Sequence, residues 1–261
     1  MDLLQYWLLV LGFFHLILFI IGLFLFLPNK IFKTTIAEYY HLFTTHFKYL
    51  IIIFGVVAFH FVEVNVLDSY FTNMLGVDFA NNIQMIEGGV VYWFSQNWEP
   101  SLIYFFVFMY IVVYPFTLWF SPLYFIITDD KKAMKTLAYG LIFIYAIALP
   151  FYLFFPVTNV YTFYGIESAL ETVIPSVESF FYSTTTINNC LPSLHVAMTL
   201  LIAKSVSITK NKKLSYFTYF CAISVTLSVI YLAIHWITDV LCGVLLAFGV
   251  FYIQKKFIQE K

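Results

Sequence analysis

Residues 3–27 read LLQYWLLVLGFFHLILFIIGLFLFL, an apolar run without a charged side chain. A helix of about 20 apolar residues is long enough to cross the hydrocarbon core of a bilayer, so this run predicts a transmembrane helix. It has no basic leader and no small-residue cleavage site, which favours a retained helix over a removable signal peptide. We therefore expect a protein whose fold is organised by the membrane.

The rest of the chain has the same character. Of its 261 residues, 62% are hydrophobic and only 10% are charged, against about 25% charged residues in soluble domains. Further apolar runs between polar breaks predict membrane spans at 48–67, 102–127, 133–155, 192–208, 214–233 and 236–253. The predicted fold class is an all-α polytopic membrane bundle of six to seven transmembrane helices, forming a single domain over residues 1–261.

The distribution of lysine predicts the orientation of the chain. All 13 basic side chains are lysines, and the formal net charge of −1 argues against nucleic acid as a partner. With the N-terminus outside, every lysine falls inside, and Lys204 near the inner end of its span reaches the same surface. We therefore expect a cell-membrane protein with a cytoplasmic C-terminus and outer segments at 68–100 and 156–191, the first of them a short amphipathic cap.

A polar-to-apolar junction at 188–195, NNCLPSLH, marks the predicted start of a helix at the outer face. Pro192 suits the first helical position. The backbone N–H groups of Ser193 and Leu194 would then be unpaired and point outward, where they suit a phosphate group. His195 would lie one turn into the helix, near the same membrane surface.

A second pair of ionisable residues is predicted at this surface. His235 and Asp239 are four residues apart near the outer end of the last span, a spacing that places them on one face of a helix. The carboxylate would accept one ring N–H of the imidazole and leave the other nitrogen free to attack. Two histidines separated by about 40 residues of chain thus map to one membrane face.

These motifs resemble those of the type 2 phosphatidic acid phosphatase and vanadium haloperoxidase superfamily, which read PSGH and SRxxxxxHxxxD. Here they read PSLH at 192–195 and SVIYLAIHWITD at 228–239. Leu194 in place of the glycine is similar to the inositol phosphorylceramide synthase branch. The resemblance covers 102–251 as a catalytic core, with two additional N-terminal helices at 1–67. It implies that His235 is the nucleophile of a phosphohistidine, that Asp239 orients it, and that His195 protonates the leaving group.

The chain departs from this pattern where the family binds phosphate. Tyr161 stands where the first motif has an arginine, and Val229 replaces the arginine of the third motif. Guanidinium groups are the usual bidentate partners of phosphate, so other groups must bind the substrate. The expected substrate-binding residues are Ser193, Leu194, Ser228, Tyr161 and Asn189. Either the site works in a drier, low-dielectric setting where such donors count for more, or its activity is weakened or altered. A bridging metal recruited by the outer glutamates is a third, less favoured option, and we expect no cofactor and no metal.

Other ionisable residues lie within the predicted spans. His60 and Glu63 share one face in the outer third of the second span, and ionisable groups inside a membrane are functional suspects. They either border the site or serve the fold. His15 alone on its helix is interpreted as structural. The cysteines are too few for a disulfide framework, and Cys221 and Cys242 are interpreted as small core residues.

The sequence therefore predicts a membrane lipid-phosphate phosphatase or phosphotransferase that acts through a phosphohistidine at the extracytoplasmic face. Its expected partners are a lipid phosphate, the bilayer and, for transfer, a polar alcohol acceptor. Hydrolysis and transfer share one covalent intermediate, so the motifs do not separate them. The alternative is a non-enzymatic lipid-phosphate-binding or transport protein on the same scaffold, which loss of both arginines favours and retention of the two histidines and Asp239 opposes.

Overall fold

A computed structural model describes the whole chain except residues 1–2, 29–30, 32–33, 179–181, 183–184 and 259–261. The described residues form helices, turns and one isolated bridge between Val157 and Asn189. The predicted all-α class is confirmed. Lys30, Lys33 and Lys261, which contributed to the predicted topology, lie outside the described residues.

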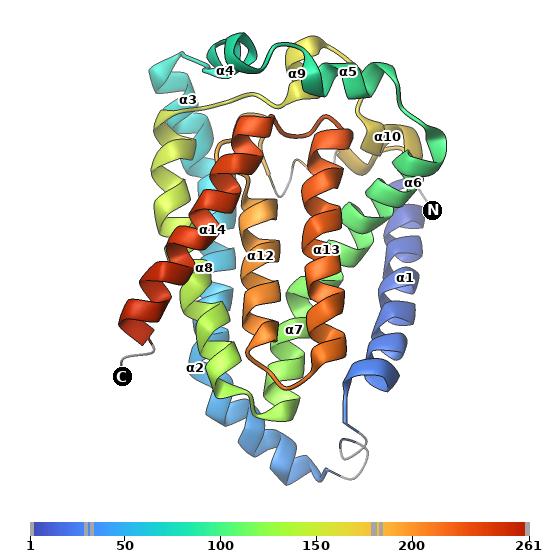
Figure 1. The fold of residues 1–261 in the computed structure, drawn as a ribbon, viewed down its shortest axis with the longest axis vertical. Helices are drawn as coiled ribbons and strands as arrows, with labels where there is room; N and C mark the ends of the chain where they lie inside the picture. The colour runs from blue at the N-terminus through green and yellow to red at the C-terminus, as the bar shows by residue number, and fades with distance from the viewer. Residues whose placement is uncertain (1–2, 29–30, 32–33, 179–181, 183–184, 259–261) are drawn as a thin grey trace.

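Long helices run along the molecule side by side (Figure 1). Among the described residues, six helical stretches are long and apolar enough to cross a membrane, and a seventh apolar helix is shorter. Their order and bounds are α1 (Leu3–Phe26), α2 (Ile36–Val62) with the π-helix η2 (Glu63–Leu67) and α3 (Asp68–Leu75), α6 (Pro100–Phe108) with the π-helix η3 (Met109–Val113) and α7 (Tyr114–Thr128), α8 (Lys131–Phe154), α12 (Leu194–Ser207), α13 (Lys212–Tyr231) and α14 (Ile237–Ile258).

The second span was predicted too short, because the helix continues through polar sequence at both ends. It runs unbroken over 36–75 rather than 48–67. Its start is fixed by a capping box in which the Thr35 side chain accepts from the Glu38 N–H and the Glu38 carboxylate accepts from the Thr35 N–H. It ends where Gly76 adopts a left-handed conformation.

The fifth span is the short helix α12, which lies at the centre of the bundle against α7, α8, α13 and α14. Its 14 residues make a helix of about 21 Å, less than the roughly 30 Å of the hydrocarbon core. The prediction that Pro192 occupies the first helical position was wrong. Ser193 is the N-cap, and its hydroxyl accepts from the Val196 N–H. The helix therefore starts two residues later, inside the bundle.

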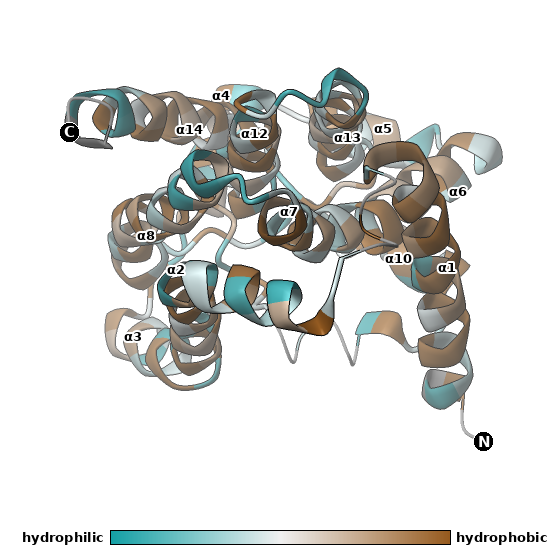
Figure 2. Ribbon diagram, turned by 90° about the horizontal axis from the view of Figure 1, so that it is seen from below, coloured by the Kyte–Doolittle hydropathy of each residue, from teal (hydrophilic) through white to brown (hydrophobic). Residues whose placement is uncertain are grey.

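Short helices form a cap across one end of the bundle (Figure 1). They are α4 (Ala80–Glu87), α5 (Val90–Gln96), α9 (Val160–Tyr164) and α10 (Ala169–Val173). The described lysines lie toward the opposite end, in the first half of α2, at the start of α8, around the turn from α12 to α13 and at the end of α14. Figure 2 shows hydrophilic residues at that end of α13 and α14. The cap end therefore differs from the lysine end in charge.

Candidate active site

A cavity of about 510 Å³ lies at the cap end of the bundle. His195 and His235 both line it, together with side chains from α1, α2, η3, α7 and α8. Because α12 starts inside the bundle, its N-terminus faces this space. Most of the wall is apolar, and the polar side chains are tyrosine, asparagine, threonine and histidine. Among the described lining residues there is no aspartate, glutamate or lysine.

The two histidines predicted to act together lie side by side in this cavity. Their ring centroids are 5.8 Å apart, with the ring planes at 61°. His195 projects from the first turn of α12, and His235 lies in the turn between α13 and α14. The structure thus brings together two residues that are 40 positions apart in the sequence, as their predicted placement at one membrane face led us to expect.

His235 is held by the turn that precedes α14 rather than by the helix itself, so its predicted place on the helix was wrong. Ala233 has a left-handed backbone with φ 56°, and the N–H groups of Ile234 and His235 both donate to the Val229 carbonyl. Asp239, in the first turn of α14, still reaches the ring. Its Oδ2 lies 3.3 Å from His235 Nδ1 and also accepts from the Trp236 N–H at 2.9 Å.

This contact decides which ring nitrogen of His235 can react. A carboxylate only accepts hydrogen bonds, so Nδ1 carries the proton and Nε2 keeps its lone pair. Asp239 is fully buried, and its Oδ1 has no hydrogen-bond partner among the described residues. The arrangement suits a nucleophilic imidazole with an orienting carboxylate behind it.

His195 has a partner that the sequence did not indicate. Its Nε2 lies 2.9 Å from the hydroxyl of Tyr110 in η3, and the ring is also in contact with that of Tyr114. Both tyrosines are buried and line the cavity. Their spacing of four residues within an aromatic-rich span offered no signal that distinguished them from core residues. Tyr110 orients the His195 ring, and its hydroxyl can either donate to Nε2 or accept from it.

The five expected substrate-binding residues divide into two groups. Leu194, Tyr161 and Asn189 line the cavity, whereas Ser193 and Ser228 do not. The Ser193 N–H donates to the Asp239 carbonyl at 3.0 Å, and the Ser228 hydroxyl donates to the Ser224 carbonyl. These two expected phosphate donors are therefore engaged within the protein. The Asn189 amide is also engaged, since its Nδ2 donates to Glu63 Oε1 at 2.7 Å.

The stretch that replaces the family's first motif packs against both other motifs. The Val157 N–H donates to the Asn188 carbonyl, and the Tyr161 N–H donates to the Ala233 carbonyl. Trp236 adds a third contact, a hydrogen bond that its Nε1–H donates to the Thr158 carbonyl. Backbone contacts thus join the three segments that carry the site.

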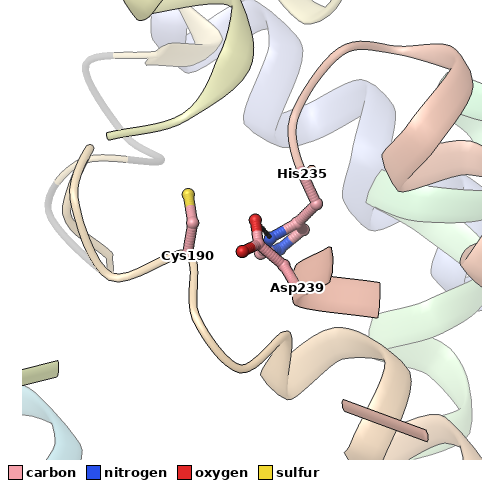
Figure 3. Close-up of side chains that lie close together, drawn as sticks. All are labelled: Cys190, His235 and Asp239. Carbon is pink, nitrogen blue, oxygen red and sulfur yellow. Dashed lines mark hydrogen bonds and ion pairs between the residues drawn. The ribbon is translucent and has the colours of Figure 1, made fainter. Parts of the chain in front are cut away.

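Cys190, His235 and Asp239 form a cluster of metal-ligating groups, with their ligand atoms within 4.8 Å of one another (Figure 3). All three are buried, and together they offer three ligands, the number of protein ligands in a catalytic zinc site and one fewer than in a structural one. Burial raises the pKa of the Cys190 thiol well above its ordinary value. The outer glutamates considered from the sequence are not members of this cluster. One of them, Glu171, has a carboxylate that instead accepts from the N–H groups of Ser176 and Glu178.

The model of one protein family matches the chain. It is that of the PAP2 superfamily, and it covers residues 86–253. This segment includes α5, α9 and α10 of the cap, the histidine pair and Asp239. No curated protein and no solved structure matches the chain.

Proposed function

The chain belongs to the PAP2 superfamily, and from this premise we propose that it is a membrane phosphatase or phosphotransferase acting on a lipid phosphate through a phosphohistidine on His235. The observation that carries the proposal is the placement of the His195 and His235 rings 5.8 Å apart in one cavity. A phosphoryl group between them would have a nucleophile on one side and an acid on the other. We assign the orienting role to Asp239.

The reaction would proceed in two steps through these groups. First, His235 Nε2 attacks phosphorus, the ester P–O bond breaks, and the departing oxygen takes a proton from His195. Second, the O–H of water or an alcohol gives its proton to His195 while its oxygen attacks phosphorus and the N–P bond breaks. Both histidines then return to their starting states. The same intermediate serves hydrolysis and transfer.

The lining supports a lipid substrate. One wall consists of apolar side chains of α1 and α2, including Leu8, Leu11 and Val56, which are suited to acyl chains. The polar groups lie around the histidines, where a headgroup phosphate would sit. Because no lysine lines the cavity in the described part of the chain, stabilisation of the phosphate falls to imidazolium and to the first N–H groups of α12, in a site screened from water.

We further propose that the site faces away from the cytoplasm. The described lysines lie toward the end opposite the cap, and lysine-rich ends of membrane proteins face the cytoplasm. The N-terminus would then be outside and the C-terminus inside, which agrees with the topology predicted from the sequence.

A panel of lipid phosphates, incubated with the purified protein, tests the proposal. His235→Ala should abolish turnover, and rapid acid-free quenching of the wild-type protein should trap a phosphohistidine that the variant lacks. His195→Ala should spare formation of the phosphohistidine from substrates with good leaving groups, which need no acid, and should slow its breakdown, for which His195 is the base. Full activity of His235→Ala would overturn the mechanism. Binding of lipid phosphates without turnover would favour a binding protein, the second candidate, which the absence of arginine from the sequence supports.

A further inference from the structure

A second polar cluster borders the cavity, centred on Glu63 at the junction of α2 and η2. The Glu63 carboxylate is fully buried and accepts from the hydroxyl of Tyr145 at 2.7 Å and from the amide of Asn189 at 2.7 Å. His60 Nδ1 lies 2.7 Å from the same tyrosine hydroxyl and 3.3 Å from the carboxylate. A buried carboxylate inside a membrane protein is costly and marks a functional group by default.

The cluster belongs to the same cavity as the histidine pair. His60, Tyr145 and Asn189 all line that cavity, while Glu63 lies behind them. Asn189 directly precedes Cys190, whose thiol is next to His235 and Asp239. Glu63 and His60 lie outside the segment that matches the superfamily, so α2 adds this wall to the shared core. The sequence left open whether these two residues border the site, and the structure places them there.

The hydrogen bonds fix the orientation of the Asn189 amide in this wall. Since a carboxylate only accepts, the Asn189 amide must turn Nδ2 toward Glu63. Its Oδ1 is thereby left as an acceptor, and it is buried with no partner among the described residues. An acceptor oxygen backed by a carboxylate repels an anion and attracts a donor hydrogen. The phosphate therefore belongs on the histidine wall, and an O–H group belongs on the Glu63 wall.

We propose that Glu63, Tyr145, His60 and Asn189 form the binding site for the hydroxyl-bearing acceptor that attacks the phosphohistidine. The proposal rests on the proposed function of the histidine pair. Asn189 Oδ1 accepts the O–H of water or of an alcohol, and Glu63 is a positioning residue that holds the amide in the required orientation. A cationic acceptor fits less well, since no carboxylate lines the cavity in the described residues and Glu63 is already engaged.

Glu63→Gln is the test variant. A glutamine amide can donate to Asn189 Oδ1, which would turn the asparagine to present Nδ2 and remove the acceptor while preserving the shape of the wall. Formation of the phosphohistidine should proceed at the wild-type rate, whereas its breakdown should slow roughly 10-fold, the effect of about one lost hydrogen bond. The phosphorylated fraction of the enzyme at steady state should rise accordingly.

Asn189→Ala should behave in the same way, and Asn188→Ala is the matched control. The Asn188 amide binds Thr72 Oγ1 instead and does not line the cavity. Each protein is assayed as the full chain in detergent by rapid quench, once in buffer alone and once with added glycerol. Slower breakdown in both conditions assigns the site to any O–H acceptor, and slower transfer to glycerol alone assigns it to an alcohol.

Two results distinguish a failure of the acceptor-site proposal from a failure of the proposed function. If Glu63→Gln slows formation of the phosphohistidine as much as its breakdown, the cluster does not serve the acceptor and the present inference falls. If the wild-type protein forms no phosphohistidine with any lipid phosphate, the proposed function itself fails. Melting temperatures of the variants, measured in the same detergent, separate a local effect from a loss of fold.

Discussion

The backbone N–H of Ser193 donates to the backbone carbonyl of Asp239 over 3.0 Å, joining the start of α12 to the first turn of α14. Ser193 lies two residues before His195, and Asp239 lies four residues after His235. This hydrogen bond therefore links the two segments that carry the histidines. The close approach also depends on Gly243, where an added Cβ would lie 2.6 Å from the Ser193 carbonyl oxygen.

Gly243→Ala should separate α12 from α14 and lower both stability and turnover. The backbone carbonyl cannot move aside as a flexible side chain would, so overpacking should cost about 1–3 kcal/mol. Gly249→Ala in the same helix is the control, because nothing lies within 4 Å of its Cβ position. Thermal unfolding and activity in detergent should distinguish the two variants. Equal behaviour of both would show that the contact does not position the site.

Asp239→Asn should keep the fold but reduce the rate of phosphohistidine formation by about 10⁴-fold, the loss seen when the orienting carboxylate of a catalytic triad becomes an amide. The asparagine side chain can donate to His235 Nδ1, which would move the proton to Nε2 and remove the lone pair that attacks. Rapid-quench trapping measures this step directly. A variant that forms the intermediate at the wild-type rate would contradict the orienting role.

Tyr110→Phe should slow turnover roughly 10-fold, because loss of one hydrogen bond to His195 Nε2 costs about 1 kcal/mol or slightly more. The effect should be largest for substrates with poor leaving groups, which need the acid. Tyr114→Phe is the matched control, since its ring also contacts His195 while its hydroxyl points to the sulfur of Met198 at 3.8 Å. Equal losses across all leaving groups would argue for a purely structural role of Tyr110.

Cys190 should react slowly with alkylating reagents at neutral pH. Burial raises its thiol pKa well above the ordinary value, and the thiolate is the reactive form, so the rate should be low at neutral pH and should still be rising with pH under alkaline conditions. In a protein whose Cys221 and Cys242 are replaced by alanine, the measured alkylation is that of Cys190 alone. Rapid modification at pH 7, or loss of activity on adding a chelator, would instead indicate a thiolate that holds a metal.

A protease-cleavable tag at the C-terminus should be protected in sealed vesicles of native orientation, and a tag at the N-terminus should be removed. The expectation follows from the lysines at the end opposite the cap. Cleavage of the C-terminal tag from outside would place the cavity on the cytoplasmic face.

Much of the fold was readable from local sequence. The spans at 102–127, 133–155, 214–233 and 236–253 agree with the observed helices apart from their terminal residues, because each apolar run ends at charged or polar residues that leave the hydrocarbon core. The second span was missed at both ends, since a helix that emerges from the membrane no longer needs apolar residues. There its bounds depend on the Thr35 capping box and on Gly76.

The sequence by itself determined the class of the fold and pointed to His195, His235 and Asp239 as one site, because hydropathy and motif spacing are local properties of the chain. How the two histidines meet depends on the contact of α12 with α14 and on the turn before α14. Only the tertiary structure decided the surroundings of that site. It engaged Ser193 and Ser228 in internal hydrogen bonds and brought Tyr110 to His195. It also placed Glu63 behind Asn189, 126 residues away. The packing of the helices determines these partners, because a buried polar group pairs with a group that the packing brings within hydrogen-bond distance.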